Sequence, residues 1–126
     1  MALKNPYQTY QQNAVNTASP QELTLMLYNG CLKFIKLSKK AMEEKNIEEK
    51  NTNILKAQAI VQEFIATLNM EIEVSAGMKQ LYEYIYNRLV EANIKNDQEI
   101  LTEVEGYITE FRDTWKQAME KSKNRK

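Results

Sequence analysis

Proline and glycine are scarce in this chain beyond its first twenty residues, and this constrains its fold more than any other feature. The last proline is Pro20, and only three glycines occur, at positions 30, 77 and 106. These two residue types interrupt α-helices: proline lacks a donor and clashes with the preceding turn, and glycine costs backbone entropy. We therefore expect an all-α protein.

The start of the first helix can be located from three residues. Ser19 can accept a backbone N–H, Pro20 occupies a position where its missing donor costs nothing, and Glu22 can complete a capping box with Ser19. Apolar spacing of three and four then predicts helices over about residues 20–45, 47–73, 76–94 and 97–121. Capping is predicted at Val74-Ser75 for the third helix and from Asn96 with Glu99 for the fourth, and Asp97 is also expected to cap a helix.

The connections between these helices are short, which makes neighbouring helices antiparallel. The sequence therefore predicts an antiparallel four-helix bundle over residues 19–121. We expect residues 1–18 to form a polar, partly ordered N-terminal leader and residues 122–126 to form a basic tail. The 126 residues, 43% of them apolar, suit a single domain with one modest core.

The overall composition argues against several classes of partner. Seventeen basic and seventeen acidic residues cancel, so no global field attracts nucleic acid. No apolar run approaches the roughly 20 residues of a spanning helix, and the first residues lack a signal-peptide core. We expect a cytoplasmic protein with no nucleic-acid partner and no membrane insertion. Cys31, the single cysteine, lies in an apolar stretch and is predicted to be a small buried core residue.

The first and third helices carry more apolar surface than one core needs. The second and fourth helices have ordinary one-sided stripes, whereas apolar residues surround most of the first. Either the four helices and the leader bury this surface among themselves, or part of it is a groove for a partner helix. The groove candidates, chosen at or beyond the edges of the core stripes, are Tyr28, Leu32, Ile60, Tyr84, Val90, Ile94 and Leu101.

The sequence offers no catalytic set. It contains no histidine and no glycine-rich phosphate loop, and its three arginines are widely spaced. The acidic run at residues 43–49 is interrupted by Lys45 and is predicted to be a solvated turn rather than a metal site. We predict a protein that is not an enzyme and has no catalytic residues, metal or cofactor.

The chain resembles the flagellar export chaperone FliS family over nearly its whole length. Thr17-Ala18-Ser19-Pro20 with Leu23 is similar to the family's TASP-x-x-L motif, and Met26-Leu27-Tyr28 with Gly30 to its MLY-x-G motif. Further similar segments are Lys56-Ala57-Gln58-Ala59-Ile60-Val61, Leu81-Tyr82-Glu83-Tyr84, Arg88-Leu89 and Trp115.

The resemblance implies a flagellin-specific export chaperone. Such a protein binds the disordered C-terminal segment of flagellin, prevents its premature polymerisation and delivers it to the flagellar export gate; other flagellar assembly factors are further candidate partners. Tyr7 and Tyr10 match tyrosines of a family segment that covers part of the client site, so we expect a leader that caps the empty groove. The alternatives are a frayed leader and a helical adaptor whose groove binds some other amphipathic helix.

Overall fold

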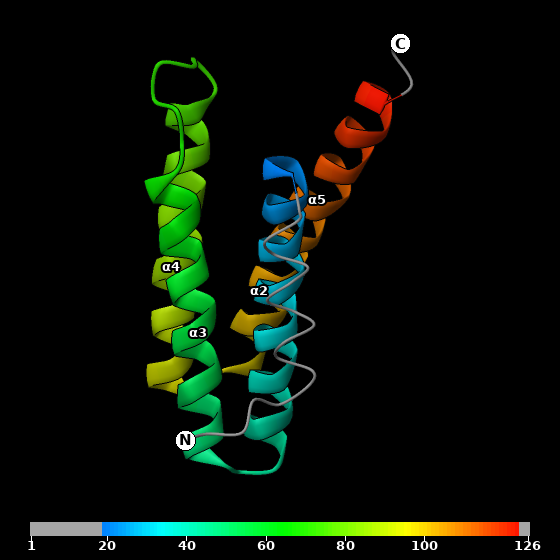
Figure 1. Cartoon of the computed structure of the whole chain (residues 1–126). Helices are drawn as coiled ribbons and strands as arrows, with labels where there is room; N and C mark the ends of the chain where they lie inside the picture. The colour runs from blue at the N-terminus through cyan, green and yellow to red at the C-terminus, as the bar shows by residue number, and fades with distance from the viewer. Residues whose placement is uncertain (1–18, 124–126) are drawn as a thin grey trace, which may run out of the picture.

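The computed structural model describes residues 19–123, which form four α-helices. They are α2 (Pro20–Glu43), α3 (Ile47–Ala66), α4 (Ser75–Lys95) and α5 (Gln98–Lys123). α2 packs against α3 and α5, and α4 packs against the same two helices, so the four close into a ring (Figure 1). Successive helices run in opposite directions, and the last turns of α5 extend away from the others (Figure 1). The expected antiparallel four-helix bundle is confirmed.

The predicted start of α2 is confirmed in detail. The Ser19 hydroxyl accepts the Glu22 N–H at 3.2 Å, and the Ser19 N–H donates to the Glu22 carboxylate at 3.2 Å. At the other end, Lys45 adopts a left-handed conformation with φ 58°, and Asn46 caps α3 by accepting the Glu49 N–H at 3.1 Å. The connection between α2 and α3 is therefore a tight turn, as the sequence predicted.

The expected C-terminal end of α3 is wrong. The helix ends at Ala66, several residues before position 73, and residues 67–74 form turns. The Thr67 hydroxyl donates to the Glu63 carbonyl at 2.9 Å, and the Asn69 side chain accepts the Glu71 N–H at 3.0 Å. Threonine and asparagine side chains that bond to nearby backbone compete with continued helix in this way.

Two predicted helix caps also need correction. Val74 precedes α4 without any side-chain capping bond, and Ser75 is buried as the first residue of the helix. Asn96 ends α4 in a left-handed conformation, with φ 54°. The Asp97 carboxylate caps α5, as also predicted, because it accepts the N–H groups of Glu99 at 2.9 Å and Ile100 at 3.4 Å.

The core contains one aromatic ring from each helix. Tyr28 lies 4.7 Å from Phe64, Phe64 lies 5.3 Å from Tyr82, and Tyr82 lies 5.0 Å from Phe111, between ring centroids. The Phe111 ring also lies 6.1 Å from the Tyr28 ring, so these four rings form a closed aromatic layer across the bundle. The remaining buried apolar residues include Cys31, Leu32, Ile35, Ile54, Ala57, Val61, Ile85, Leu89, Ala92, Ile100, Leu101, Val104 and Ile108.

Candidate functional site

Two hydrogen bonds between side chains show the register of α3 against α4. The Asn93 amide donates to the Asn51 side-chain oxygen at 2.8 Å, and the Gln62 amide donates to the Tyr86 hydroxyl at 3.4 Å. Because the helices are antiparallel, residues between Asn51 and Gln62 lie opposite residues between Tyr86 and Asn93. The outer surface of this helix pair can therefore be followed residue by residue.

Apolar side chains follow this outer surface between the two contacts. Leu55 lies one helical turn after Asn51 and is 49% exposed. Val90 and Ile94 lie one and two turns after Tyr86; Val90 is half-buried and Ile94 is 79% exposed. We use the term α3/α4 face for the surface formed by Leu55, Gln62, Ile65, Ala66, Tyr86, Val90 and Ile94.

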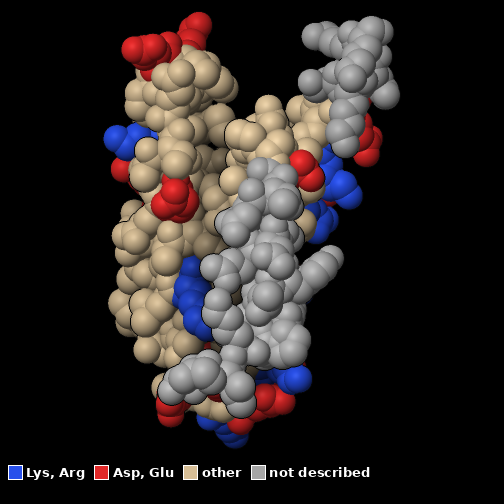
Figure 2. Space-filling view, in the orientation of Figure 1, with Lys and Arg blue, Asp and Glu red and all other residues tan. Residues whose placement is uncertain are grey.

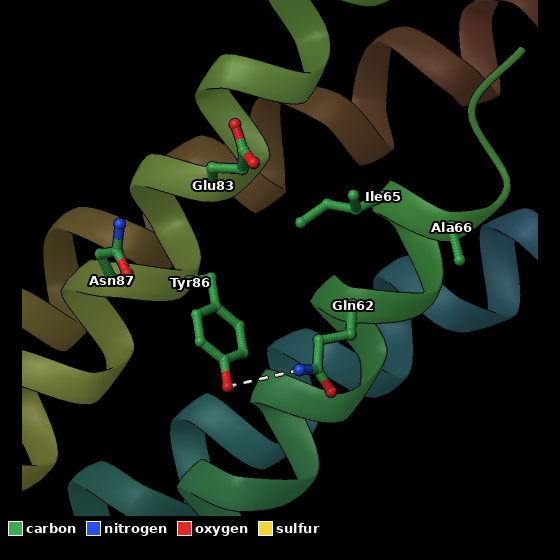
Figure 3. Close-up of a pocket in the computed structure, with 6 residues that line it drawn as sticks. All are labelled: Gln62, Ile65, Ala66, Glu83, Tyr86 and Asn87. Atoms are coloured by element: carbon green, nitrogen blue, oxygen red, sulfur yellow. Dashed lines mark hydrogen bonds between the residues drawn. The ribbon is translucent and has the colours of Figure 1, made fainter. Parts of the chain in front are cut away.

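The upper part of the α3/α4 face is hollowed. A hollow of about 630 Å³ is lined by Gln62, Ile65 and Ala66 from α3 and by Glu83, Tyr86 and Asn87 from α4. Ile65 and the Tyr86 ring point toward the space between the two helices, and the bond from Gln62 crosses its lower edge (Figure 3). Glu83 is the one charged residue in this lining, so an occupant would meet an amphipathic surface.

Figure 2 shows one side of α3 and α4. Most of the surface visible there is formed by uncharged side chains. Acidic side chains gather at its upper end, where the connection between α3 and α4 lies (Figures 1 and 2). That connection also exposes Met70, Ile72 and Val74 by 54%, 52% and 63%. Exposed apolar side chains that cluster in this way are typical of interaction surfaces.

The predicted groove residues do not form one surface. Tyr28, Leu32 and Leu101 are buried in the core, with exposed fractions of 4%, 4% and 0%. They were expected at the edges of the core stripes, and the structure corrects this placement: Tyr28 joins the aromatic layer and bonds the Tyr82 hydroxyl at 2.9 Å. Val90 and Ile94 lie together on the α3/α4 face.

Ile60 and Tyr84 lie on two other sides of the bundle. Ile60 is half-buried and packs toward α2, where its Cδ1 is 3.5 Å from the position that a Cβ on Gly30 would take. Tyr84 is 42% exposed and packs edge-on against Tyr107 of α5, with ring centroids 6.1 Å apart. Tyr7 and Tyr10, the predicted leader cap, lie outside the described residues.

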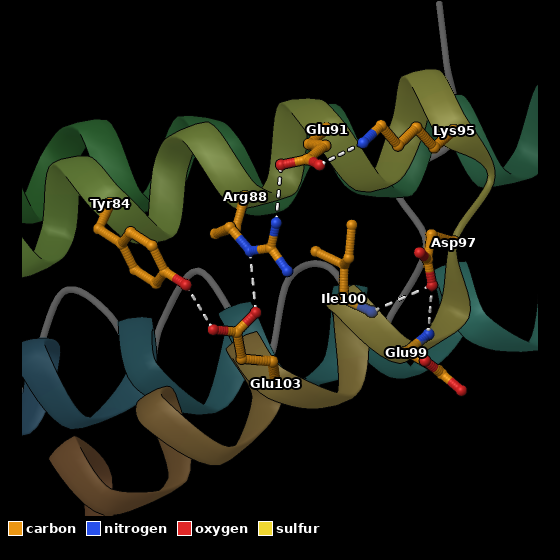
Figure 4. Close-up of polar contacts among 8 residues, drawn as sticks. All are labelled: Tyr84, Arg88, Glu91, Lys95, Asp97, Glu99, Ile100 and Glu103. Carbon is orange, nitrogen blue, oxygen red and sulfur yellow. Dashed lines mark hydrogen bonds and ion pairs between the residues drawn. The ribbon is translucent and has the colours of Figure 1, made fainter.

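Tyr84 also belongs to a polar network that joins α4 to α5 (Figure 4). Its hydroxyl donates to Glu103 at 2.6 Å, and Arg88 donates to the same carboxylate at 2.9 Å. Arg88 further bonds Glu91 at 2.7 Å, which in turn bonds Lys95 at 2.7 Å. The bond from Tyr84, aided by Arg88 and opposed by partial burial, holds the pKa of Glu103 below its usual range.

Cys31 has the role that the sequence predicted. The side chain is fully buried, and this burial raises the pKa of the thiol to about 12. The thiol therefore stays protonated and packs as a small apolar group.

Leu55 and Tyr86 were missed as candidates for the exposed surface. The sequence did carry a signal for Leu55: it is spaced four and seven residues from Asn51 and Gln62, on the side of α3 away from its core stripe. Helical spacing places Tyr86 outside the core stripe of its helix, but the sequence does not reveal the residues of α3 that make it part of a hollow.

A family model described as flagellar protein FliS matches residues 3–122 of the chain. This chain belongs to the FliS family. A flagellar secretion chaperone FliS of Bacillus subtilis (strain 168) is 62% identical over 120 residues, covering 95% of this chain and 90% of the relative. FliSB of Pseudomonas aeruginosa is 34% identical, with 90% and 92% covered, and FliS of Salmonella typhimurium is 31% identical, with 88% and 84% covered.

Membership of the FliS family supports a role in flagellar secretion as a chaperone, a kind of protein that is not an enzyme. The predicted family is thus confirmed by matches that extend across nearly the whole chain. Among the helices of residues 19–123, none combines the length and the apolar character needed to cross a membrane.

Proposed function

We propose that this FliS-family protein is a cytoplasmic export chaperone for flagellin. It binds the disordered C-terminal segment of flagellin, keeps it from polymerising early and delivers it to the flagellar export apparatus. The observation that carries the proposal is the family match over residues 3–122, together with an accessible apolar surface on α3 and α4.

The α3/α4 face suits an amphipathic segment that becomes helical on binding. Its apolar side chains follow two adjacent helices, so a third helix can lie along them with its own apolar row facing inward. Leu55 is about half exposed and Ile94 is about four-fifths exposed. Burial of each side chain by the bound segment would stabilise the complex by about 1 kcal/mol or more. Of the groove residues predicted from sequence, the proposal assigns Val90 and Ile94 to this contact.

The mechanism we propose needs no chemical step. A segment that polymerises through its apolar face cannot do so while the chaperone covers that face. Ordering the segment costs about 2–5 kcal/mol, so the contact must be extended to give useful affinity. The same entropic cost allows release once the export apparatus holds the segment.

The first test is calorimetric titration of the full chain with a peptide covering the C-terminal segment of flagellin, with circular dichroism of the mixture. We expect one-to-one binding with submicromolar Kd and a gain in helicity, because the peptide folds on the surface. Absence of binding by a folded protein and a soluble peptide would contradict the proposal and favour an adaptor for another amphipathic helix.

Ile94 provides the sharper test of where the segment lies. Replacing this exposed side chain by aspartate (Ile94→Asp) should weaken peptide binding about tenfold or more, because a charge would be buried in the contact. The matched variant Ile94→Leu keeps the apolar surface and should bind within about twofold of the parent. Equal binding by all three proteins would remove the α3/α4 face from the proposal, and equal melting temperatures would exclude a folding defect.

A further inference from the structure

A second furrow lies between α2 and α5, on the opposite side of the ring from the α3/α4 face. Two adjoining hollows of about 440 and 520 Å³ share Leu32, Lys36 and Arg112 in their linings. Leu32 is 4% exposed and forms the floor. We call this space the α2/α5 furrow.

Small residues from α5 keep the furrow open. Thr102, Gly106 and Thr109 line it at spacings of four and three residues, which places them on one side of the helix. Apart from its chain neighbours and the nearby backbone of its own helix, no atom of residues 19–123 lies within 4 Å of the position that a Cβ on Gly106 would take. A chain segment could therefore approach the backbone of α5 closely at this point.

The rim of the furrow is basic. Lys33, Lys36 and Lys40 lie along the α2 side at spacings of three and four residues, and all three are exposed. Lys36 and Lys40 form no ion pair with any residue between positions 19 and 123. The Lys33 ammonium lies 5.5 Å from the centroid of the Phe34 ring.

The acidic side chains near this rim already form ion pairs. Glu105, the one acidic residue in the linings of the two hollows, bonds Lys39 at 3.1 Å. Arg112 bonds Asp113 at 3.1 Å and keeps its other donors available. Because the whole chain has no net charge, this excess of positive charge is a local property of the furrow.

We propose that the α2/α5 furrow binds an acidic segment of another protein. In this arrangement the segment places an apolar side chain over Leu32 and Gly106, and its carboxylates reach Lys36, Lys40 and Arg112. A leucine floor and a width set by two helices favour a polypeptide over nucleic acid, whose phosphates would gain nothing from the apolar contact.

The occupant comes from another molecule. Residues 1–18 and 124–126, which lie outside the described residues, contain no aspartate or glutamate, so these segments have no acidic side chains to place against the lysines. The furrow and the α3/α4 face lie on opposite sides of the bundle, so both can be occupied together. The proposal goes beyond the binding of flagellin and stands whether or not flagellin is the client.

The test uses nuclear magnetic resonance of the full, nitrogen-15-labelled chain. The probe is a synthetic helical peptide with leucines along one side and glutamates on the flanking positions; the control is the same peptide with every glutamate replaced by glutamine. Two glycine amides serve as reporters, since Gly106 lies in the furrow and Gly77 lies near the start of α4.

We expect the glutamate peptide to shift the amides of Thr102, Gly106 and Thr109 and to leave Gly77 unchanged. Raising the salt concentration from about 0.05 M to about 0.5 M should weaken this binding several-fold, since exposed charge pairs are screened. Equal shifts with the glutamine peptide, or shifts confined to the α3/α4 face, would overturn the proposal.

Matched variants test the charges. The triple variant Lys36→Glu, Lys40→Glu, Arg112→Glu should lose binding about tenfold or more, because three attractive contacts become repulsive. The control Lys45→Glu, Lys79→Glu, Lys121→Glu changes the net charge equally away from the furrow and should bind within about twofold of the parent. Should the triple variant not fold, Lys36→Gln with Lys40→Gln keeps the test available, with a smaller loss expected.

Three further outcomes would overturn the proposal. Equal losses in the two triple variants would mean that net charge alone governs the binding. The same furrow shifts with duplex DNA or with vesicles containing phosphatidylglycerol would indicate a general polyanion surface. Shifts of Thr102, Gly106 and Thr109 on concentrating the protein alone would assign the furrow to self-association.

Discussion

At the scale of single residues, Tyr28 and Tyr82 form a hydroxyl pair buried in the core. The two oxygens are 2.9 Å apart inside the aromatic layer, where the two rings are 4% and 2% exposed. Burial raises the pKa of Tyr28 and of Tyr82, so both hydroxyls stay neutral and one donates a hydrogen bond to the other. No buried side-chain donor or acceptor between residues 19 and 123 lacks a partner.

The variant Tyr28→Phe should lower the free energy of unfolding by about 1–3 kcal/mol, because it leaves the Tyr82 hydroxyl buried without a partner. Replacing both tyrosines by phenylalanine should cost less than the sum of the two single changes, since no unpaired group remains. Urea unfolding followed by the fluorescence of Trp115, the only tryptophan, measures all four proteins. Strictly additive losses would contradict the coupling.

These tyrosines also mark a limit of sequence-based prediction. Tyr28 was chosen as a groove residue because helical periodicity places it nearly opposite Leu23 and Met26. Periodicity describes one helix alone, and a helix that contacts two neighbours in a ring can bury a wider arc than a single stripe. The Tyr82 hydroxyl and the Phe64 ring, which cover Tyr28, belong to helices far away in the chain.

At the scale of helices, local signals predicted starts better than ends. The capping box of Ser19 and Glu22 was predicted because all its atoms lie within one turn. The end of α3 was missed because residues 68 and 72 continue its apolar spacing, whereas Thr67 and Asn69 turn the backbone. Leu68 is half-buried, but Ile72 is 52% exposed and does not join the core.

The network between α4 and α5 makes a prediction about pH. The pKa of Glu103 is lowered in the folded protein, so its contribution to stability is present above the usual carboxyl pKa of about 4.3 and is lost as the pH falls through the lowered value. The variant Glu103→Gln should therefore be less stable than the parent at about pH 7, and the difference should shrink toward about pH 3.

Denaturant unfolding at both pH values measures this effect. The control is Glu110→Gln, which changes an exposed carboxylate of the same helix that makes no ion pair with residues 19–123. A stability difference between Glu103→Gln and the parent that stays constant with pH would show that the carboxylate's charge contributes nothing at this position.

At the scale of the whole molecule, the ring of four helices separates two surfaces of different chemistry. The α3/α4 face is amphipathic with exposed apolar side chains, and the α2/α5 furrow is basic, with neither pair of helices contributing to the other surface. A chaperone with this arrangement could hold a client on one side and meet a second protein on the other.

The leader gives a prediction at this scale. Tyr7 and Tyr10 lie outside the described residues, and their role as a cap of the client surface stays a prediction from sequence. Deleting residues 2–12 should speed association with the flagellin peptide by up to about tenfold, because a surface that is mostly covered is available only part of the time. Stopped-flow fluorescence measures the rate.

The full-length variant with Tyr7→Ala and Tyr10→Ala separates the loss of the aromatic contacts from the loss of chain length. It should associate as fast as the deletion if the two rings provide the cap. Unchanged association rates in both proteins would favour the frayed leader.

The sequence by itself determined the helical class, the antiparallel order, the start of α2 and the family, because these depend on capping groups, on helix breakers and on motifs within a few turns of chain. Only the tertiary structure decided which apolar residues are exposed, because burial depends on neighbours brought from other helices. Leu32 shows the difference: its helix placed it at the edge of a stripe, and α5 made it the buried floor of a basic furrow.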